Sequence, residues 1–161
     1  MAELVYSYRR DREMTALLSS CMVTAPGARR RAKNLPDPGS FEMIAQWDTG
    51  ASNCAISRGI VEYLGIKPIG GKINVKGVNG TFESDIYAVD ILLPNGIVFE
   101  NVRVTEMKKE DVPLIIIGLN IIARSDFRLE PKGDKTIMKF RYPPEGDKPF
   151  TTEPTPLFQE E

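Results

Sequence analysis

Short apolar segments separated by turn residues are the feature that most limits what this chain can fold into. Every second residue of segment 41–47 is apolar, and alternation with period two predicts a β-strand. The dipeptide Asn95-Gly96 lies between two further strand-like segments, 89–93 and 97–104, and predicts a two-residue hairpin turn. A chain built from such pieces is expected to be mainly β.

The remaining segments extend this pattern and add one or two short helices. Ser57 and Gly65 predict the start and the end of a helix at 58–64, and a second short helix is expected at 119–123. Segment 21–24 is expected to pair with 41–47, and the other strands are expected at 73–75, 81–93, 114–117, 127–129 and 136–140. The number of strands and the spacing of the turns predict a closed, barrel-like sheet.

The length of 161 residues and a hydrophobic content of 42% suit one domain with a hydrophobic core. We expect this domain at 18–142, after an N-terminal extension at 1–17. Within it, residues 25–40 contain three prolines and two glycines and are expected to form an inserted loop. Residues 143–161 are rich in Pro and Glu and predict a flexible tail.

The composition also excludes several kinds of chemistry and partner. The sequence contains no histidine, which rules out Ser-His-Asp and Cys-His catalysis and removes the usual ligand of catalytic zinc, so no metal or cofactor is expected. Its two cysteines, Cys21 and Cys54, are expected to be buried thiols. A net charge of -1 and the lack of a membrane-length apolar run predict no nucleic-acid or membrane partner. Because the N-terminus does not resemble a signal peptide, a cytoplasmic location is expected.

The residues that carry chemistry gather in the segment that follows the 41–47 strand, Asp48-Thr49-Gly50-Ala51-Ser52. A glycine-containing turn can direct backbone N–H groups at a carboxylate, and a carboxylate held in this way can act as a general base on water. The alternative interpretation is a structural turn, because Asp, Thr and Gly all favour turns.

This segment resembles the active-site signature of aspartic proteases, and Ile116-Ile117-Gly118 resembles their second signature. The continuation Leu119-Asn120 and the glycine-tipped hairpin 77–80 between the two motifs are similar to the retropepsin-like (retroviral-type) branch. The resemblance covers about residues 21–140 and implies a retropepsin fold with a closed β-barrel.

The resemblance also implies a mechanism and an assembly. Aspartic proteases need two neighbouring carboxylates that share a proton, and this chain contains one Asp-Thr-Gly motif, so it implies a homodimeric aspartic endopeptidase that hydrolyses extended peptides. By the same resemblance, the catalytic residues are Asp48, Thr49 and Gly50. The substrate-binding residues are Ala51, Ser52, Gly77, Val78, Asn79 and Gly80, the last four forming a flap.

Two positions depart from the retroviral pattern. Viral enzymes place an Asp and an Arg that form an ion pair where this sequence has Ser52 and Leu119, so this region must be built differently. Two further functions stay open: a catalytically silent retropepsin-like module for dimerisation or peptide binding, and an unrelated β-barrel binding protein.

Overall fold

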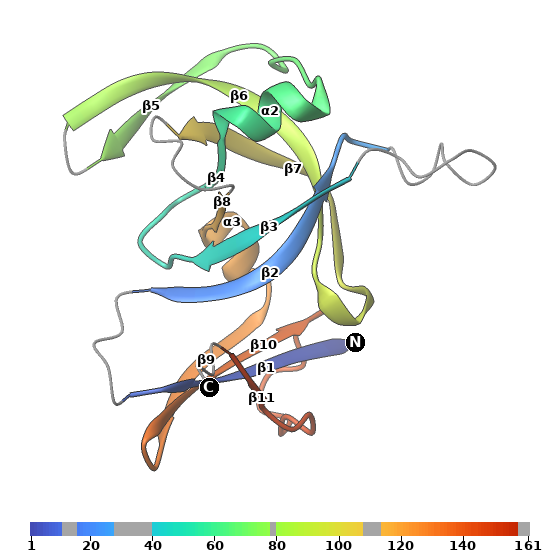
Figure 1. Ribbon diagram of the computed structural model, residues 1–161, viewed down its shortest axis with the longest axis vertical. Coiled ribbons are helices and arrows are strands. Elements are labelled where there is room, and N and C mark those ends of the chain that lie inside the picture. The colour runs from blue at the N-terminus through green and yellow to red at the C-terminus, as the bar shows by residue number, and fades with distance from the viewer. Residues whose placement is uncertain (11–15, 28–39, 78–79, 108–113, 158–161) are drawn as a thin grey trace.

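The computed structural model describes residues 1–10, 16–27, 40–77, 80–107 and 114–157, which form two sheets (Figure 1). The elements outside the sheets are α2 (Arg58–Leu64), the 3-10 turn η2 (Pro94–Gly96) and α3 (Leu119–Ile122). The larger sheet contains, in order across it, β2 (Leu17–Thr24), β3 (Ser40–Trp47), β8 (Leu114–Ile117), β4 (Cys54–Ser57), β7 (Val98–Met107), β6 (Gly80–Leu92) and β5 (Lys72–Gly77). The smaller sheet has the order β11 (Thr155–Pro156), β1 (Ala2–Arg9), β10 (Lys135–Tyr142) and β9 (Asp126–Lys132).

The larger sheet confirms the expected pairing of the first strands. β2 and β3 are antiparallel, with Cys21 opposite Met43, and β3 and β8 are parallel, with Trp47 opposite Ile117. β2 makes an additional antiparallel pairing with the long strand β6, in which Val23 lies opposite Ile91. The chain is therefore mainly β, as the sequence predicts.

The predicted turns are also present. Asn95 and Gly96 both have positive φ, 61° and 75°, which is the backbone of the expected two-residue hairpin turn. Gly65 ends α2 with a left-handed φ of 63°. Ser57 precedes α2 as expected, but its side chain makes no capping bond to the helix. Instead its hydroxyl donates to the carbonyl of Leu114 and accepts the N–H of the same residue, which ties β4 to β8.

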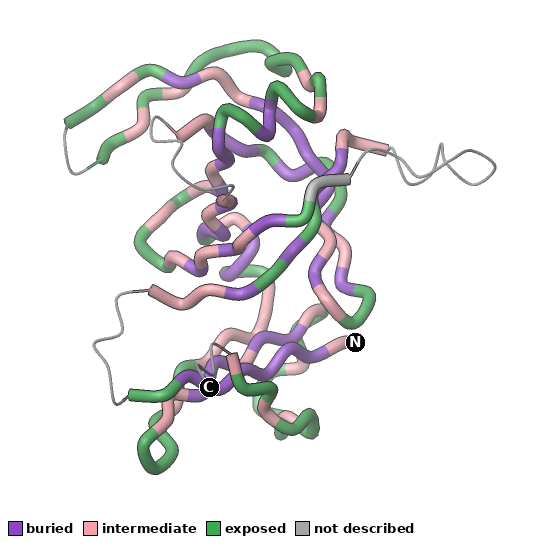
Figure 2. Tube along the Cα trace, viewed as in Figure 1, coloured by how far each residue is buried: buried purple, intermediate pink, exposed green. Residues whose placement is uncertain are grey.

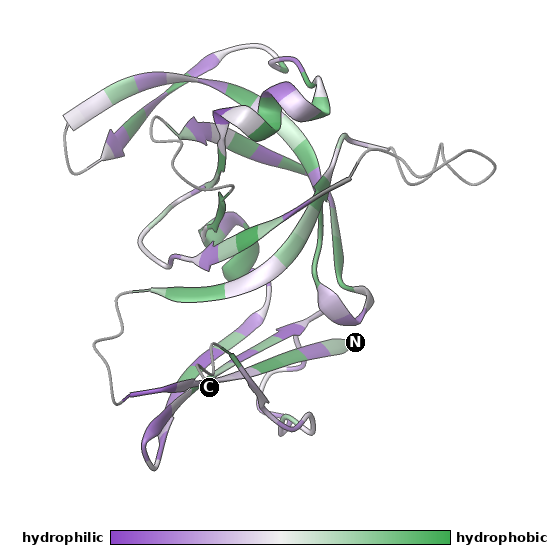
Figure 3. Cartoon of the chain, in the orientation of Figure 1, coloured by the Kyte–Doolittle hydropathy of each residue, from purple (hydrophilic) through white to green (hydrophobic). Residues whose placement is uncertain are grey.

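The two sheets share one hydrophobic core (Figure 2). Trp47 at the end of β3 packs against Phe140 of β10, with ring centroids 4.9 Å apart, and Phe140 also packs against Phe99 of β7. Figure 3 shows how strongly hydrophobic β8 and parts of α3 are, and Ile117 and Ile121 are fully buried. Trp47 therefore connects the end of β3 rigidly to the rest of the core.

The first strand, β1, was not expected from the sequence. It lies within the segment 1–17 that we treat as an N-terminal extension, and it pairs antiparallel with β10 from Ala2 opposite Tyr142 to Arg9 opposite Lys135. Leu4 and Tyr6 of β1 belong to the common core. The division of the chain into extension, domain and tail stays a prediction.

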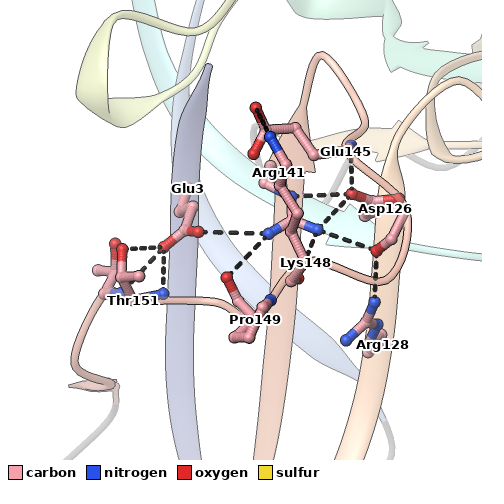
Figure 4. Close-up of polar contacts among 10 residues, drawn as sticks. Glu3, Asp126, Arg128, Arg141, Glu145, Lys148, Pro149 and Thr151 are labelled. Atoms are coloured by element: carbon pink, nitrogen blue, oxygen red, sulfur yellow. Dashed lines mark hydrogen bonds and ion pairs between the residues drawn. The ribbon is translucent and has the colours of Figure 1, made fainter.

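Residues 143–157, which composition predicts to be flexible, are held against the smaller sheet. We call this segment the strap. Arg141 of β10 is fully buried beneath it and bonds Asp126 at 2.7 Å and Glu3 at 3.5 Å (Figure 4). The guanidinium also donates to strap carbonyls, those of Gly146, Lys148 and Pro149. The low apolar content of the strap gave no sign of this attachment, because hydrogen bonds to charged groups hold the strap in place.

Glu3 fixes the strap from the other side. One of its carboxylate oxygens accepts the backbone N–H groups of Thr151 and Thr152 at 3.0 and 2.9 Å. Burial by itself raises the pKa of Glu3, but these hydrogen bonds and the charge of Arg141 outweigh it, so the pKa lies below its usual value. For Asp126, the N–H of Glu145 at 2.8 Å and the Arg141 guanidinium likewise lower the pKa.

Candidate active site

The parallel pairing of β3 with β8 determines where Asp48 lies. Trp47 is opposite Ile117, and the N–H of Asp48 donates to the Ile117 carbonyl at 3.0 Å. The next residue of each strand therefore leaves the sheet at the same place. Asp48 and Gly118, which the sequence analysis assigns to two separate motifs, begin adjacent turns.

The backbone of the turn after Asp48 orients the Asp48 carboxylate. The N–H of Gly50 donates to Asp48 Oδ1 at 2.8 Å, and the N–H of Ala51 donates to the Asp48 carbonyl at 3.2 Å. A Cβ at Gly50 would lie 3.1 Å from the same carboxylate oxygen, so glycine permits this close approach. Asp48 is half-buried while Thr49 and Gly50 are exposed, and the carboxylate is thus oriented but open to a ligand.

The start of α3 is joined to this turn through backbone hydrogen bonds. Leu119 N–H donates to the Ala51 carbonyl at 2.8 Å, and Asn120 N–H donates to the Ser52 carbonyl at 3.2 Å. Gly118 packs against the turn so closely that a Cβ there would lie 2.6 Å from the Asn53 carbonyl oxygen. Ser52 and Leu119 stand where retroviral enzymes have their ion pair. Here backbone hydrogen bonds connect the turn to α3 instead, and the Leu119 side chain is 39% exposed.

Asn120 is the supporting residue whose contacts the sequence did not reveal. Its side-chain oxygen accepts from Cys54 at the backbone N (2.9 Å) and at Sγ (3.1 Å), and its Nδ2 donates to the Arg103 carbonyl at 3.2 Å. Its position two residues after Gly118 is the sequence signal that could have indicated this supporting role. Asn120 therefore links the end of the Asp48 turn to β7.

Cys54 is a buried free thiol, as predicted. Burial raises its pKa to about 11, although hydrogen bonds from Gly118 and to Asn120 act in the opposite direction. A thiol with this pKa is almost entirely protonated at neutral pH, and Cys54 accordingly serves as packing for the turn.

The expected flap corresponds to the hairpin β5–β6. Gly77 and Gly80 face each other as its last pair, while Val78 and Asn79 lie outside the described residues. Ile73, Val75 and Phe82 form one half-buried side of the hairpin, and charged and uncharged polar residues occupy the other. In Figure 1 the free end of this hairpin and the turn after β3 both lie at the left of the molecule.

Within residues 1–10, 16–27, 40–77, 80–107 and 114–157, His, Cys, Asp and Glu form no group of three or more that could hold a metal ion. Among those residues, no helix has the length and apolar character needed to cross a bilayer.

A mainly β chain that holds an Asp-Thr-Gly turn against a Gly-Leu-Asn helix start has the architecture of an aspartic protease. The family model for aspartyl proteases matches residues 39–121, and the chain belongs to this family, with a retropepsin-like fold. The fold is similar to the crystal structure of a retropepsin-like aspartic protease from Rickettsia conorii, with 16% identity, a TM-score of 0.50, and coverage of 86% of this chain and 90% of that chain.

A second solved structure, simian foamy virus (mac) protease, matches at 17% identity with a TM-score of 0.41, covering 65% of this chain and 92% of that chain. No curated protein matches this sequence.

Proposed function

We propose that this chain is an aspartic endopeptidase whose active site contains Asp48 from each of two copies. The observation that carries the proposal is the state of Asp48. Its carboxylate is half-buried, oriented by the Gly50 N–H at 2.8 Å, and backed by a turn bonded to β8 and α3. A rigidly held carboxylate beside open space is the group needed to activate water for attack on a peptide carbonyl.

Dimerisation follows from the chemistry of the reaction. One carboxylate must accept a proton from water while a second donates one, and two carboxylates in contact achieve this by sharing a proton. The sequence has a single Asp-Thr-Gly motif, so the second carboxylate comes from another copy.

The other predicted site residues act within this dimer. Thr49, exposed at the tip of the turn, contacts the neighbouring copy, and the β5–β6 hairpin closes over an extended peptide that binds as an added strand. Ala51 and Ser52 border the peptide. The additional β2–β6 pairing supports the interpretation of the larger sheet as a closed barrel. A cytoplasmic location stays a prediction.

Cleavage is tested with wild type, Asp48→Asn, and the control variant Asp147→Asn, which changes an exposed aspartate of the strap. Each is incubated with a mixed peptide library from pH 3 to 8, with and without a pepstatin-type inhibitor, and products are read by mass spectrometry. We expect inhibitor-sensitive cleavage by wild type and the control, and none by Asp48→Asn. A folded, dimeric wild type that cleaves nothing would favour the silent peptide-binding module.

Subunit mixing tests the shared site directly. Wild type and Asp48→Asn are mixed in equal amounts, allowed to exchange, and assayed on a peptide found in the first experiment. If each site needs the Asp48 of both copies, mixed dimers are inactive, and about a quarter of the activity of the same total amount of wild type remains. Retention of half the activity would show that one copy is sufficient, and would contradict the dimeric site.

A further inference from the structure

The outer face of the smaller sheet lies on the side opposite the common core. Cross-strand partners point to the same face of a sheet, and alternate residues share a face. Leu4, Tyr6 and Tyr8 of β1 are core residues, so the intervening residues and their partners on β10 and β9 form the outer face. This places four rows there: Glu3, Arg141 and Asp126; Val5, Lys139 and Arg128; Ser7, Ile137 and Glu130; and Arg9, Lys135 and Lys132.

The strap covers only part of this face. The end of the strap, β11, does not cross the face but pairs with the edge of β1, where the Ser7 carbonyl accepts the Leu157 N–H at 3.1 Å. The first row is neutralised by the Arg141 contacts described above. Val5 and Ile137 are buried beneath the strap, whereas Arg9 and Lys132 of the last row are exposed and Lys135 is half-buried.

The last row places three cations side by side. Arg9 is opposite Lys135, and Lys135 is opposite Lys132, on three adjacent strands. Arg10 adds a fourth cation, because its guanidinium bonds the Gly133 carbonyl in the hairpin turn, while Asp134 is the acidic residue of that turn. These cations make this edge of the sheet positively charged, and such a surface favours a negatively charged partner.

A pocket adjoins this row. It has a volume of about 240 Å³ and lies between the sheet and the strap, with an apolar part formed by Val5, Ile137, Phe150 and Pro154. Lys132 borders both the pocket and the cationic row, and Lys139 in the pocket is already paired with Glu130 at 2.7 Å. The surface thus offers cationic groups and, next to them, space for an apolar side chain.

We propose that the row Arg9–Lys135–Lys132 and the adjoining pocket bind an acidic peptide segment of a partner protein that carries an apolar residue beside its carboxylates. Charge complementarity with the row selects the acidic residues, and the pocket receives the apolar one. A peptide matches these features better than a nucleic acid does because the pocket beside the cations is partly apolar and can receive an apolar side chain. This binding goes beyond the proposed cleavage and does not require Asp48.

The test uses the full chain carrying Asp48→Asn, so that cleavage cannot consume the probe. A fluorescein-labelled peptide of alternating Glu and Leu is titrated at low salt and binding is measured by fluorescence anisotropy. Lys132→Gln/Lys135→Gln is compared with Arg58→Gln/Lys67→Gln, which removes the same charge from exposed positions outside both this surface and the β5–β6 hairpin. We expect the first pair to weaken binding about tenfold and the control pair to leave it nearly unchanged.

The peptide is varied as well. Replacing its Glu residues by Gln, replacing Leu by Ser, or raising the salt concentration should each weaken binding. Equal effects of the two double substitutions, or insensitivity to the Leu replacement, would overturn the proposal. So would equally tight binding of a single-stranded oligonucleotide of the same charge. Much tighter peptide binding by Glu160→Gln/Glu161→Gln would assign the surface to the chain's own C-terminal residues and overturn a separate partner.

Discussion

Gly118→Ala is the substitution that tests most directly how the Asp48 turn is held. Gly118 has φ -97° and ψ -171°, a conformation that alanine adopts freely, so only the added methyl group matters. That methyl would lie 2.6 Å from the Asn53 carbonyl oxygen and 2.8 Å from the Ala51 carbonyl oxygen. These are backbone atoms, and they must retreat by about 0.8 Å to reach an ordinary contact.

The magnitude follows from what this movement disrupts. Overpacking of this kind costs about 1–3 kcal/mol. The Leu119 N–H bond to Ala51, now 2.8 Å, becomes too long, which costs about 1 kcal/mol more. We therefore expect the free energy of unfolding to fall by about 2–4 kcal/mol. A shift of nearly 1 Å near Asp48 should also lower kcat/KM on the order of 100-fold.

Trp47 provides the assay. It is the single tryptophan of the chain, is buried, and immediately precedes Asp48, so its fluorescence during urea unfolding reports on this region. Gly59→Ala is the matched control, because a Cβ at Gly59 in α2 meets no atom within 4 Å. Alanine there should stabilise the helix by about 0.5–1 kcal/mol. If Gly118→Ala unfolds and cleaves like wild type, the close contact does not position the turn.

Three further predictions concern the supports of the site and the strap. Asn120→Ala leaves the buried Cys54 N–H without its acceptor and should lower the free energy of unfolding by about 1–3 kcal/mol, measured by urea titration against Asn120→Asp, which keeps an acceptor oxygen. Arg141→Met leaves the buried carboxylate of Glu3 and the half-buried carboxylate of Asp126 without their cation and should cost about 3–5 kcal/mol. If Arg141→Met costs as much in the Glu3→Gln/Asp126→Asn background, the charge pairing is not the cause. The fold lowers the pKa of the Glu3 and Asp126 carboxyl groups. Their contribution to stability is therefore present above their unfolded pKa values of about 4 and is lost as pH falls through the lower folded values. In denaturation experiments at different pH values, wild type should lose more stability between pH 5 and 2 than Glu3→Gln/Asp126→Asn.

Local signals account for the parts of this molecule that the sequence predicts well. The Asp48 turn, the Asn95-Gly96 turn and the glycine at the end of α2 each depend on residues within a few positions of one another. Such features are set by backbone preferences and can be read from a short stretch of sequence.

Long-range partners account for the parts that the sequence did not predict. Glu3 and Ser7 resemble exposed residues in a short polar N-terminus, but their strand is buried on both faces because the core packs on one face and the strap lies on the other. The strap itself is held by Arg141, which is buried only because Glu3 and Asp126 lie beside it in space. A prediction from composition rests on apolar content, and it therefore underestimates how firmly a segment is attached when ion pairs and hydrogen bonds hold it.

The pairing of β1 with β10 also has a consequence for how the protein is made. Ala2 emerges from the ribosome before its partner Tyr142, which follows 140 positions later, and this interval takes on the order of ten seconds at ordinary rates of translation. During that time Leu4, Val5 and Tyr6 have no strand to join and their apolar surface is open to other nascent chains. The smaller sheet can assemble only after synthesis of β10, so this fold must be completed late, and chaperone occupancy of the first ten residues is the expected protection.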